Sequence, residues 1–249
     1  MSATDDLLTA FELHDPDRIR AALAAGASPT AAIRGKPPID WLIEMYLRSP
    51  RLPTCVGVML EAGAVLGDPM LKSILLDDPE GLDAVLTASP ERLVRPMSLV
   101  CAFTSLRGVS PLHVAAEYGA AACARALLAA GADVDARAAI DAEGLGGQTP
   151  LFHTVNSILN HGRPVMELLL DAGATPDIRL VGLRWGEGFD WETTVFDVSP
   201  ISYAQCGLYS QFHRREADVY GVIATLYERR HGRPAPVANV PNRYLAPKA

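Results

Sequence analysis

Residues 108–119 read GVSPLHVAAEYG, and residues 126–134 read ALLAAGADV. Ser110 is a good N-cap, because its hydroxyl can accept from a free backbone N–H in the first turn of a helix. Pro111 suits the first helical position, where its missing N–H costs no hydrogen bond. Gly131 can take the left-handed conformation that closes a helix. The stretch therefore predicts two short helices that follow one another closely.

This stretch resembles the ankyrin repeat. The family pattern is G-x-T-P-L-H-x-A-A-x-x-G, followed by an apolar helix that ends L-L-x-x-G-A-D-V. In the first half only Ser110 departs from it, where the family has Thr. The chain is identified as a member of the ankyrin-repeat family, of a divergent, bacterial type. The resemblance implies a structural role for His113, which would hydrogen-bond within the turn region.

Weaker copies of the pattern recur on both sides of this stretch. Residues 68–89 are interpreted as a degenerate copy, in which Asp78 caps the second helix. Together the copies predict about six helix pairs, each repeat normally being about 33 residues long. The other copies occupy residues 15–27, 37–64, 149–174 and 199–227. Helices are expected to open near Pro38, Pro111, Pro150 and Pro200.

Three insertions lengthen the chain between helix pairs. They fall at residues 90–107, 135–147 and 177–197. In the last, two stretches rich in β-branched and aromatic residues flank Gly186 and Gly188, a pattern typical of a β-hairpin. We therefore predict hairpin fingers projecting from the helical scaffold.

The predicted fold is an all-α ankyrin-repeat solenoid with these β-hairpin finger insertions, covering residues 1–232. One helix pair is too thin to bury its apolar face, whereas stacked pairs share a continuous core. Leu128 and Leu170 are expected to be fully buried between repeats, and Glu117 is expected to lie on the solvent face. Residues 233–249 form a proline-rich C-terminal tail.

The 177–197 hairpin is the predicted recognition element. Aromatic residues mixed with arginine are the usual anchors of binding surfaces. The alternative is that the rings pack the hairpin onto neighbouring repeats, which an isolated hairpin needs for stability. Both interpretations stay open at this stage. The candidate binding residues, including two on the facing last repeat, are Arg184, Trp185, Glu187, Phe189, Asp190, Trp191, Tyr203 and His213.

Composition excludes several classes of function. The net charge is −7 and no basic run stands alone, so no nucleic-acid partner is expected. No segment approaches the roughly 20 apolar residues of a membrane span, and the acidic N-terminus is unlike a secretory signal. We expect a cytoplasmic protein. Its four cysteines have no metal-ligand spacing and are interpreted as reduced packing residues.

No catalytic residue, metal or cofactor is predicted. The histidines lack metal-ligand spacing, and Cys206 with His213 lacks a third orienting group, so that pair is weak evidence for a nucleophile. The predicted function is non-catalytic recognition of a protein partner of unknown identity through the concave face and fingers. The alternative is an enzyme or small-molecule binder with a pocket between the 177–197 hairpin and the last repeat. An oligomeric structural module is a third interpretation, because the sequence leaves the oligomeric state open.

Overall fold

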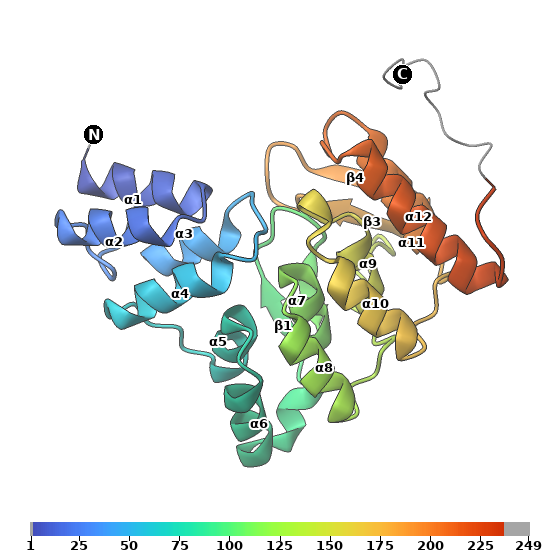
Figure 1. The fold of residues 1–249 in the computed structure, drawn as a ribbon, viewed down its shortest axis with the longest axis horizontal. Coiled ribbons are helices and arrows are strands. Elements are labelled where there is room, and N and C mark those ends of the chain that lie inside the picture. Colours follow the sequence, from blue (N-terminus) through green and yellow to red (C-terminus); the bar gives the residue numbers. More distant parts are fainter. Residues whose placement is uncertain (1, 237–249) are drawn as a thin grey trace.

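The computed structural model describes residues 2–236 of the 249-residue chain. Over this range it contains twelve α-helices and two small sheets (Figure 1). The helices come in consecutive pairs along the chain. The first three pairs are α1 (Ala3–Glu12) with α2 (Pro16–Ala24), α3 (Pro38–Glu44) with α4 (Leu52–Glu61), and α5 (Pro69–Leu76) with α6 (Pro79–Ala88). The last three are α7 (Pro111–Tyr118) with α8 (Ala121–Ala129), α9 (Pro150–Val155) with α10 (Arg163–Asp171), and α11 (Pro200–Gln205) with α12 (Glu216–His231).

The predicted helix starts are confirmed. In α11 the Ser199 hydroxyl accepts from the backbone N–H of Ser202 at 3.3 Å, and in α6 the Asp78 carboxylate accepts from Gly81 at 3.0 Å. Such caps satisfy N–H groups that have no partner within the helix. Four helices begin at the predicted prolines, Pro38, Pro111, Pro150 and Pro200.

The helix pairs stack in chain order. The first helices form one layer, in which α7 contacts α5 and α9, and α9 contacts α11. The second helices form another, in which α8 contacts α6 and α10. Figure 1 shows this succession from the N-terminal pairs to α12. Apolar side chains from all six pairs join one continuous buried cluster.

One packing expectation is wrong. Leu127 is fully buried, whereas Leu128 is only half-buried. Successive helix residues point about 100° apart, so the two leucines cannot face the core equally. Leu170 on α10 is buried, as expected.

Two of the three predicted insertions form antiparallel hairpins. In the first, β1 (Met97–Leu99) pairs with β2 (Leu106–Val109), after a short 3₁₀ turn at Pro90–Leu93. In the longest, β3 (Leu180–Trp185) pairs with β4 (Thr193–Val198), which confirms the predicted hairpin. The middle insertion forms a loop with one isolated bridge between Ile140 and Gly146. Two further 3₁₀ turns lie at Ile158–Asn160 and Cys206–Leu208.

Backbone hydrogen bonds join the three insertions into one finger layer. The N–H of Ala139 donates to the carbonyl of Arg107 at 3.2 Å, which links the middle loop to β2. The N–H of Gly146 donates to Gly182 at 2.8 Å, which links the same loop to β3. Gly146 has φ of +107°, and a Cβ there would meet the carbonyl oxygen of Ala139 at 2.3 Å, so this link requires glycine.

The last helix is longer than expected. A second helix was predicted over residues 219–227, but α12 extends from Glu216 to His231. Of the predicted proline-rich tail, residues 237–249 lie outside the described part of the chain. Within residues 2–236 no helix is both long enough and apolar enough to span a bilayer.

Candidate functional site

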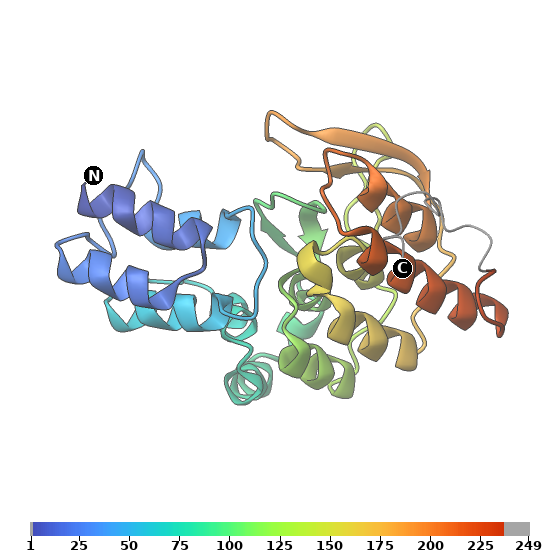
Figure 2. The ribbon, with the colours of Figure 1, turned by 45° about the horizontal axis from the view of Figure 1, so that its top comes forward.

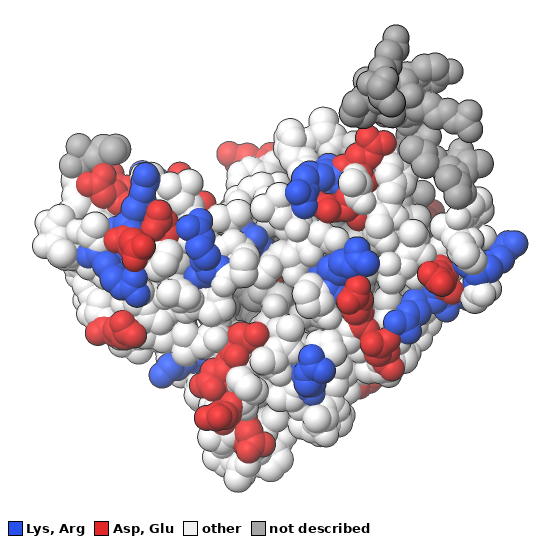
Figure 3. Space-filling view, in the orientation of Figure 1, with Lys and Arg blue, Asp and Glu red and all other residues white. Residues whose placement is uncertain are grey.

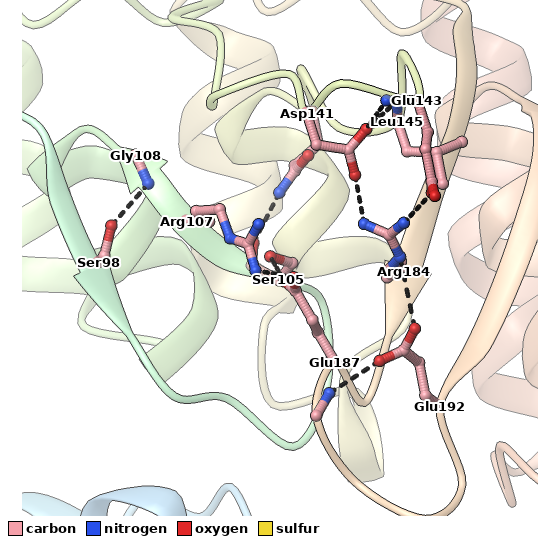
Figure 4. Close-up of polar contacts among 12 residues, drawn as sticks. Ser98, Ser105, Arg107, Gly108, Asp141, Glu143, Leu145, Arg184, Glu187 and Glu192 are labelled. Carbon is pink, nitrogen blue, oxygen red and sulfur yellow. Dashed lines mark hydrogen bonds and ion pairs between the residues drawn. The ribbon is translucent and has the colours of Figure 1, made fainter.

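Arg184 lies at the centre of the finger layer. On β3 it stands opposite Thr194, and its guanidinium forms ion pairs with Asp141 and Glu143 of the middle loop (Figure 4). A third carboxylate, that of Glu192, lies 3.4 Å from its Nε. The hydrogen bond to Asp141 raises the pKa of Arg184 above its ordinary value. Arg184 therefore fastens the hairpin to the middle loop.

Glu187 fastens the opposite side of the hairpin. Its carboxylate accepts hydrogen bonds from the hydroxyl of Ser105 and the guanidinium of Arg107, as Figure 4 shows. Both donors belong to the first hairpin and its connection, and the Ser98 hydroxyl stabilises that hairpin by accepting from the N–H of Gly108 at 2.9 Å. The predicted binding residues Arg184 and Glu187 are thus already engaged in contacts between fingers.

The depression between Arg107 and Arg184 is small. It is lined by polar side chains that include Ser105, Asp141 and Glu187, and it encloses about 20 Å³. That volume holds about one water molecule. It is far below the several hundred Å³ of a typical small-molecule site.

The hairpin tip carries an exposed aromatic patch. Phe189 and Trp191 stack with their ring centroids 4.6 Å apart, and Tyr46 meets Trp191 edge-on at 6.1 Å. Trp191 is 42 % exposed and Tyr46 is 38 % exposed. Asp190, also predicted, is exposed beside the two hairpin rings. Tyr46, Phe189 and Trp191 are called the hairpin-tip patch below.

Tyr46 was missed by sequence reasoning. It lies in the connection between α3 and α4, far along the chain from the hairpin. Figure 2 shows the hairpin loop pointing toward the N-terminal helix pairs, which is how Trp191 reaches Tyr46. The one signal in the sequence was that Tyr46 lies between two helices, where an aromatic side chain can contact a distant segment.

Two predicted binding residues lie in the core. Trp185 is 1 % exposed, and its ring lies 4.4 Å from that of Phe212 between centroids. Tyr203 is fully buried, and its hydroxyl forms a 2.9 Å hydrogen bond with Thr104. The packing interpretation therefore applies to these two rings. Together with Phe212 they fill the space between the hairpin and the last helix pair.

His213 does not join the other candidates. It is exposed in the loop that leads to α12, with a φ of +50°, while its neighbour Phe212 points into the core. Within residues 2–236 its side chain forms no hydrogen bond or ion pair. Cys206 is buried, and burial raises the pKa of its thiol to about 11, so the thiolate is disfavoured.

A buried polar network lies beneath the finger layer, around Glu117 of α7. One carboxylate oxygen lies 3.4 Å from Nε of Arg48, and the other lies 3.0 Å from Nδ1 of His153. Arg48 also places its guanidinium over the rings of Phe103 at 4.9 Å and Tyr118 at 4.5 Å. The network joins the α3–α4 connection to α7 and α9.

The expectation that Glu117 faces solvent is wrong, since it is 5 % exposed. Helix α7 is buried on every side, and all eight of its residues are buried. The α3–α4 connection covers the face that the repeat pattern would leave open. Arg48 on that connection supplies the counter-charge without which a buried carboxylate would be costly.

His113 has the structural role that the resemblance implied. Its Nε2–H donates to the carbonyl of Gln148 at 3.0 Å, so Nδ1 is free to accept from the backbone N–H of Ser110 at 3.1 Å. Burial lowers its pKa to about 3, which keeps the ring neutral. Among the described residues no group of three or more His, Cys, Asp or Glu side chains is arranged to hold a metal ion.

One segment of the chain resembles a known protein family. The model described as ankyrin repeat matches residues 107–139, from β2 through α7 and α8 to the middle loop. Among curated proteins, none matches the chain.

Proposed function

The chain carries an ankyrin repeat at residues 107–139, and on that premise we propose that it is a recognition module for a protein partner. Ankyrin repeats generally mediate protein–protein interaction. The finger layer and the hairpin-tip patch form the proposed binding surface. The stacked helix pairs act as a solenoid scaffold beneath them, which is the usual division of roles in repeat proteins.

The exposed hairpin-tip patch is the observation that carries this proposal. Tyr and Trp side chains are enriched among the residues that dominate binding energy at interfaces. Here Trp191 and Tyr46 are each about two-fifths exposed, and Phe189 stacks on Trp191 from the same loop. Their positions are held before a partner arrives, because the ion pairs of Arg184 and Glu187 fix the hairpin. A preorganised patch loses less conformational entropy on binding.

The residues of the candidate site have different proposed roles. Arg184 and Glu187 position the hairpin through their contacts with other fingers. Asp190 is exposed and available to orient a partner. Trp185 and Tyr203 stabilise the base of the hairpin from the core. The surface contact is therefore assigned to Tyr46, Phe189, Asp190 and Trp191.

The test is capture from an extract of the native cells with the full chain as bait. We expect Phe189→Ala with Trp191→Ala to lose the partner that the unaltered chain captures reproducibly. Phe196→Ala is the matched control, because Phe196 is an exposed aromatic residue on the same hairpin outside the patch. Equal capture by all three proteins would contradict the proposed surface. Loss in both variants would indicate that the hairpin acts as a whole.

A further inference from the structure

A groove runs along the strand β1, at the end of the finger layer that lies beside α5. One depression, of about 450 Å³, lies between the start of α5 and residues 92–99. A second, of about 350 Å³, is lined by residues 98–101, by residues 105–107 at the start of β2, and by Glu187 and Gly188 of the hairpin loop. The two share Ser98 and Leu99, so they meet at β1. We call them together the β1-edge groove.

The strand in this groove has one free edge. Among the described residues β1 pairs only with β2. Its side chains alternate, since Met97 and Leu99 are half-buried and Ser98 is exposed. A strand with a free edge offers backbone N–H and C=O groups to another extended segment. Addition of a peptide strand to such an edge is a common mode of recognition.

The groove has an unneutralised positive charge. Arg92 is bound to Asp68 at 2.7 Å, and that carboxylate also caps α5. Arg107 is bound to Glu187 on the other side. Arg95 lines the groove, is exposed, and has no ion-pair partner within residues 2–236. Of the three arginines that line the groove, Arg95 is thus the one whose charge is left for a ligand.

We propose that the β1-edge groove binds an extended, acidic peptide segment of a partner protein, which pairs with the free edge of β1 and places a carboxylate at Arg95. The half-buried Met97 and Leu99 provide apolar contacts for alternate side chains of the peptide. This inference rests on the proposed function, because it specifies the partner of the same finger surface. The groove ends at Glu187, within the loop that carries the hairpin-tip patch.

Two other occupants fit the groove less well. Residues 237–249 of this chain include Arg243 and Lys248, contain no acidic side chain, and carry two prolines that cannot donate to a strand. A second copy of the chain would bring its own net charge of −7 against that of the first. Figure 3 shows acidic side chains gathered over the lower part of this face, where α6 lies with Glu80 and Asp83, and a second copy would carry the same acidic surface.

The test uses a displayed library of random peptides of about nine residues, which extend over roughly 30 Å as strands. The library is selected on the immobilised full chain, and affinities of the enriched peptides are measured by fluorescence anisotropy. We expect enrichment of peptides with Asp or Glu next to alternating β-branched residues and without proline. Placing proline at the centre of an enriched peptide should abolish binding, because it removes a backbone donor.

Charge reversal at Arg95 tests the site itself. Arg95→Glu should weaken binding about ten-fold or more, since like charges then face each other across the interface. Arg125→Glu is the matched control, because Arg125 is an exposed arginine on α8 without an ion pair in the described range, and it should bind as the unaltered chain does. Circular dichroism checks that both variants remain folded.

Several results would overturn the inference. No enrichment, or enriched peptides without acidic residues, would exclude this ligand chemistry. Peptides that survive Arg95→Glu but are lost with Trp191→Ala would place binding at the hairpin-tip patch, leaving the proposed function intact. Displacement of the peptides by a synthetic copy of residues 237–249 would identify the tail as the occupant. A dimer seen by light scattering and lost with Arg95→Glu would identify a second copy.

Discussion

Helix α7 and the β3–β4 hairpin are stabilised in different ways. Every residue of α7 is buried, and its one carboxylate is paired inside the protein with Arg48 and His153. The hairpin has one face in the core, through Trp185, and exposes Trp191 at its tip. Its ion pairs lie near the surface, where charges are partly screened. Helix α7 therefore stabilises the fold, whereas the tip of the hairpin leaves side chains exposed at the proposed binding surface.

The largest effect on stability is expected at Glu117. Glu117→Ala leaves the guanidinium of Arg48 buried without a counter-charge, which should lower the free energy of unfolding by about 3–5 kcal/mol. Urea denaturation followed by circular dichroism measures the change. Glu167→Ala is the control, because the pair of Glu167 with Arg163 is about half exposed and should contribute less than about 1 kcal/mol. Similar losses in the two variants would show that the buried network has no special importance.

A second comparison lies within α8. Leu127→Ala should lower the free energy of unfolding by about 2–5 kcal/mol, the usual range for a leucine removed from a core. Leu128→Ala should have a clearly smaller effect, because its side chain is only half-buried. Urea denaturation of the two variants side by side tests the register of α8. A larger loss for Leu128 would mean that the helix is rotated from the position described.

The buried histidine His14 predicts a dependence of stability on pH. Burial and the nearby charge of Arg48 lower its pKa from 6.5 to about 4. The unfolded chain therefore takes up a proton at higher pH than the folded protein, so stability is full above pH 6.5 and falls as the pH drops toward 4. The loss attributable to His14 should be roughly 1–3 kcal/mol.

The control for this prediction is His14→Gln. An amide at this position can still hydrogen-bond Ser49, which lies 2.9 Å from Nδ1 of His14, but it does not titrate. Melting temperatures measured from pH 7 to pH 4 should fall less in this variant than in the unaltered chain. Identical pH profiles would contradict the assignment to His14.

Local patterns predicted the parts of the fold that depend on neighbouring residues. The helix starts at Pro111 and Pro150 follow from proline at the first helical position, and the hairpin follows from two β-rich runs around glycine. The contacts of Glu117 with Arg48 could not be predicted in this way. They depend on how the α3–α4 connection folds back over α7. The repeat motif specifies the helices and says nothing about the path of that connection. Tyr46 was missed as part of the hairpin-tip patch for the same reason.

In the candidate site, too, the sequence predicted the segment but not which of its side chains are exposed. Composition identified the hairpin loop, but it could not separate Trp185 from Trp191. The two tryptophans lie on the same hairpin, yet one is 1 % exposed and the other 42 % exposed. The difference depends on Phe212 and Phe103, which pack against Trp185 from the connection before α12 and from the β1–β2 connection. Which ring is buried is therefore decided by segments outside the hairpin.

The smallest effect on stability is expected at Trp191. Trp191→Ala removes a stacked ring that is already two-fifths exposed, so the free energy of unfolding should fall by less than about 1.5 kcal/mol. Trp185→Ala removes a fully packed ring from the same hairpin and should cost about 3–5 kcal/mol. If Trp191 belongs to the binding surface, its replacement abolishes partner capture at nearly unchanged stability, whereas Phe196→Ala changes neither. A loss of stability at Trp191 as large as that at Trp185 would make the whole hairpin part of the scaffold, and the binding surface would then have to be sought along β1.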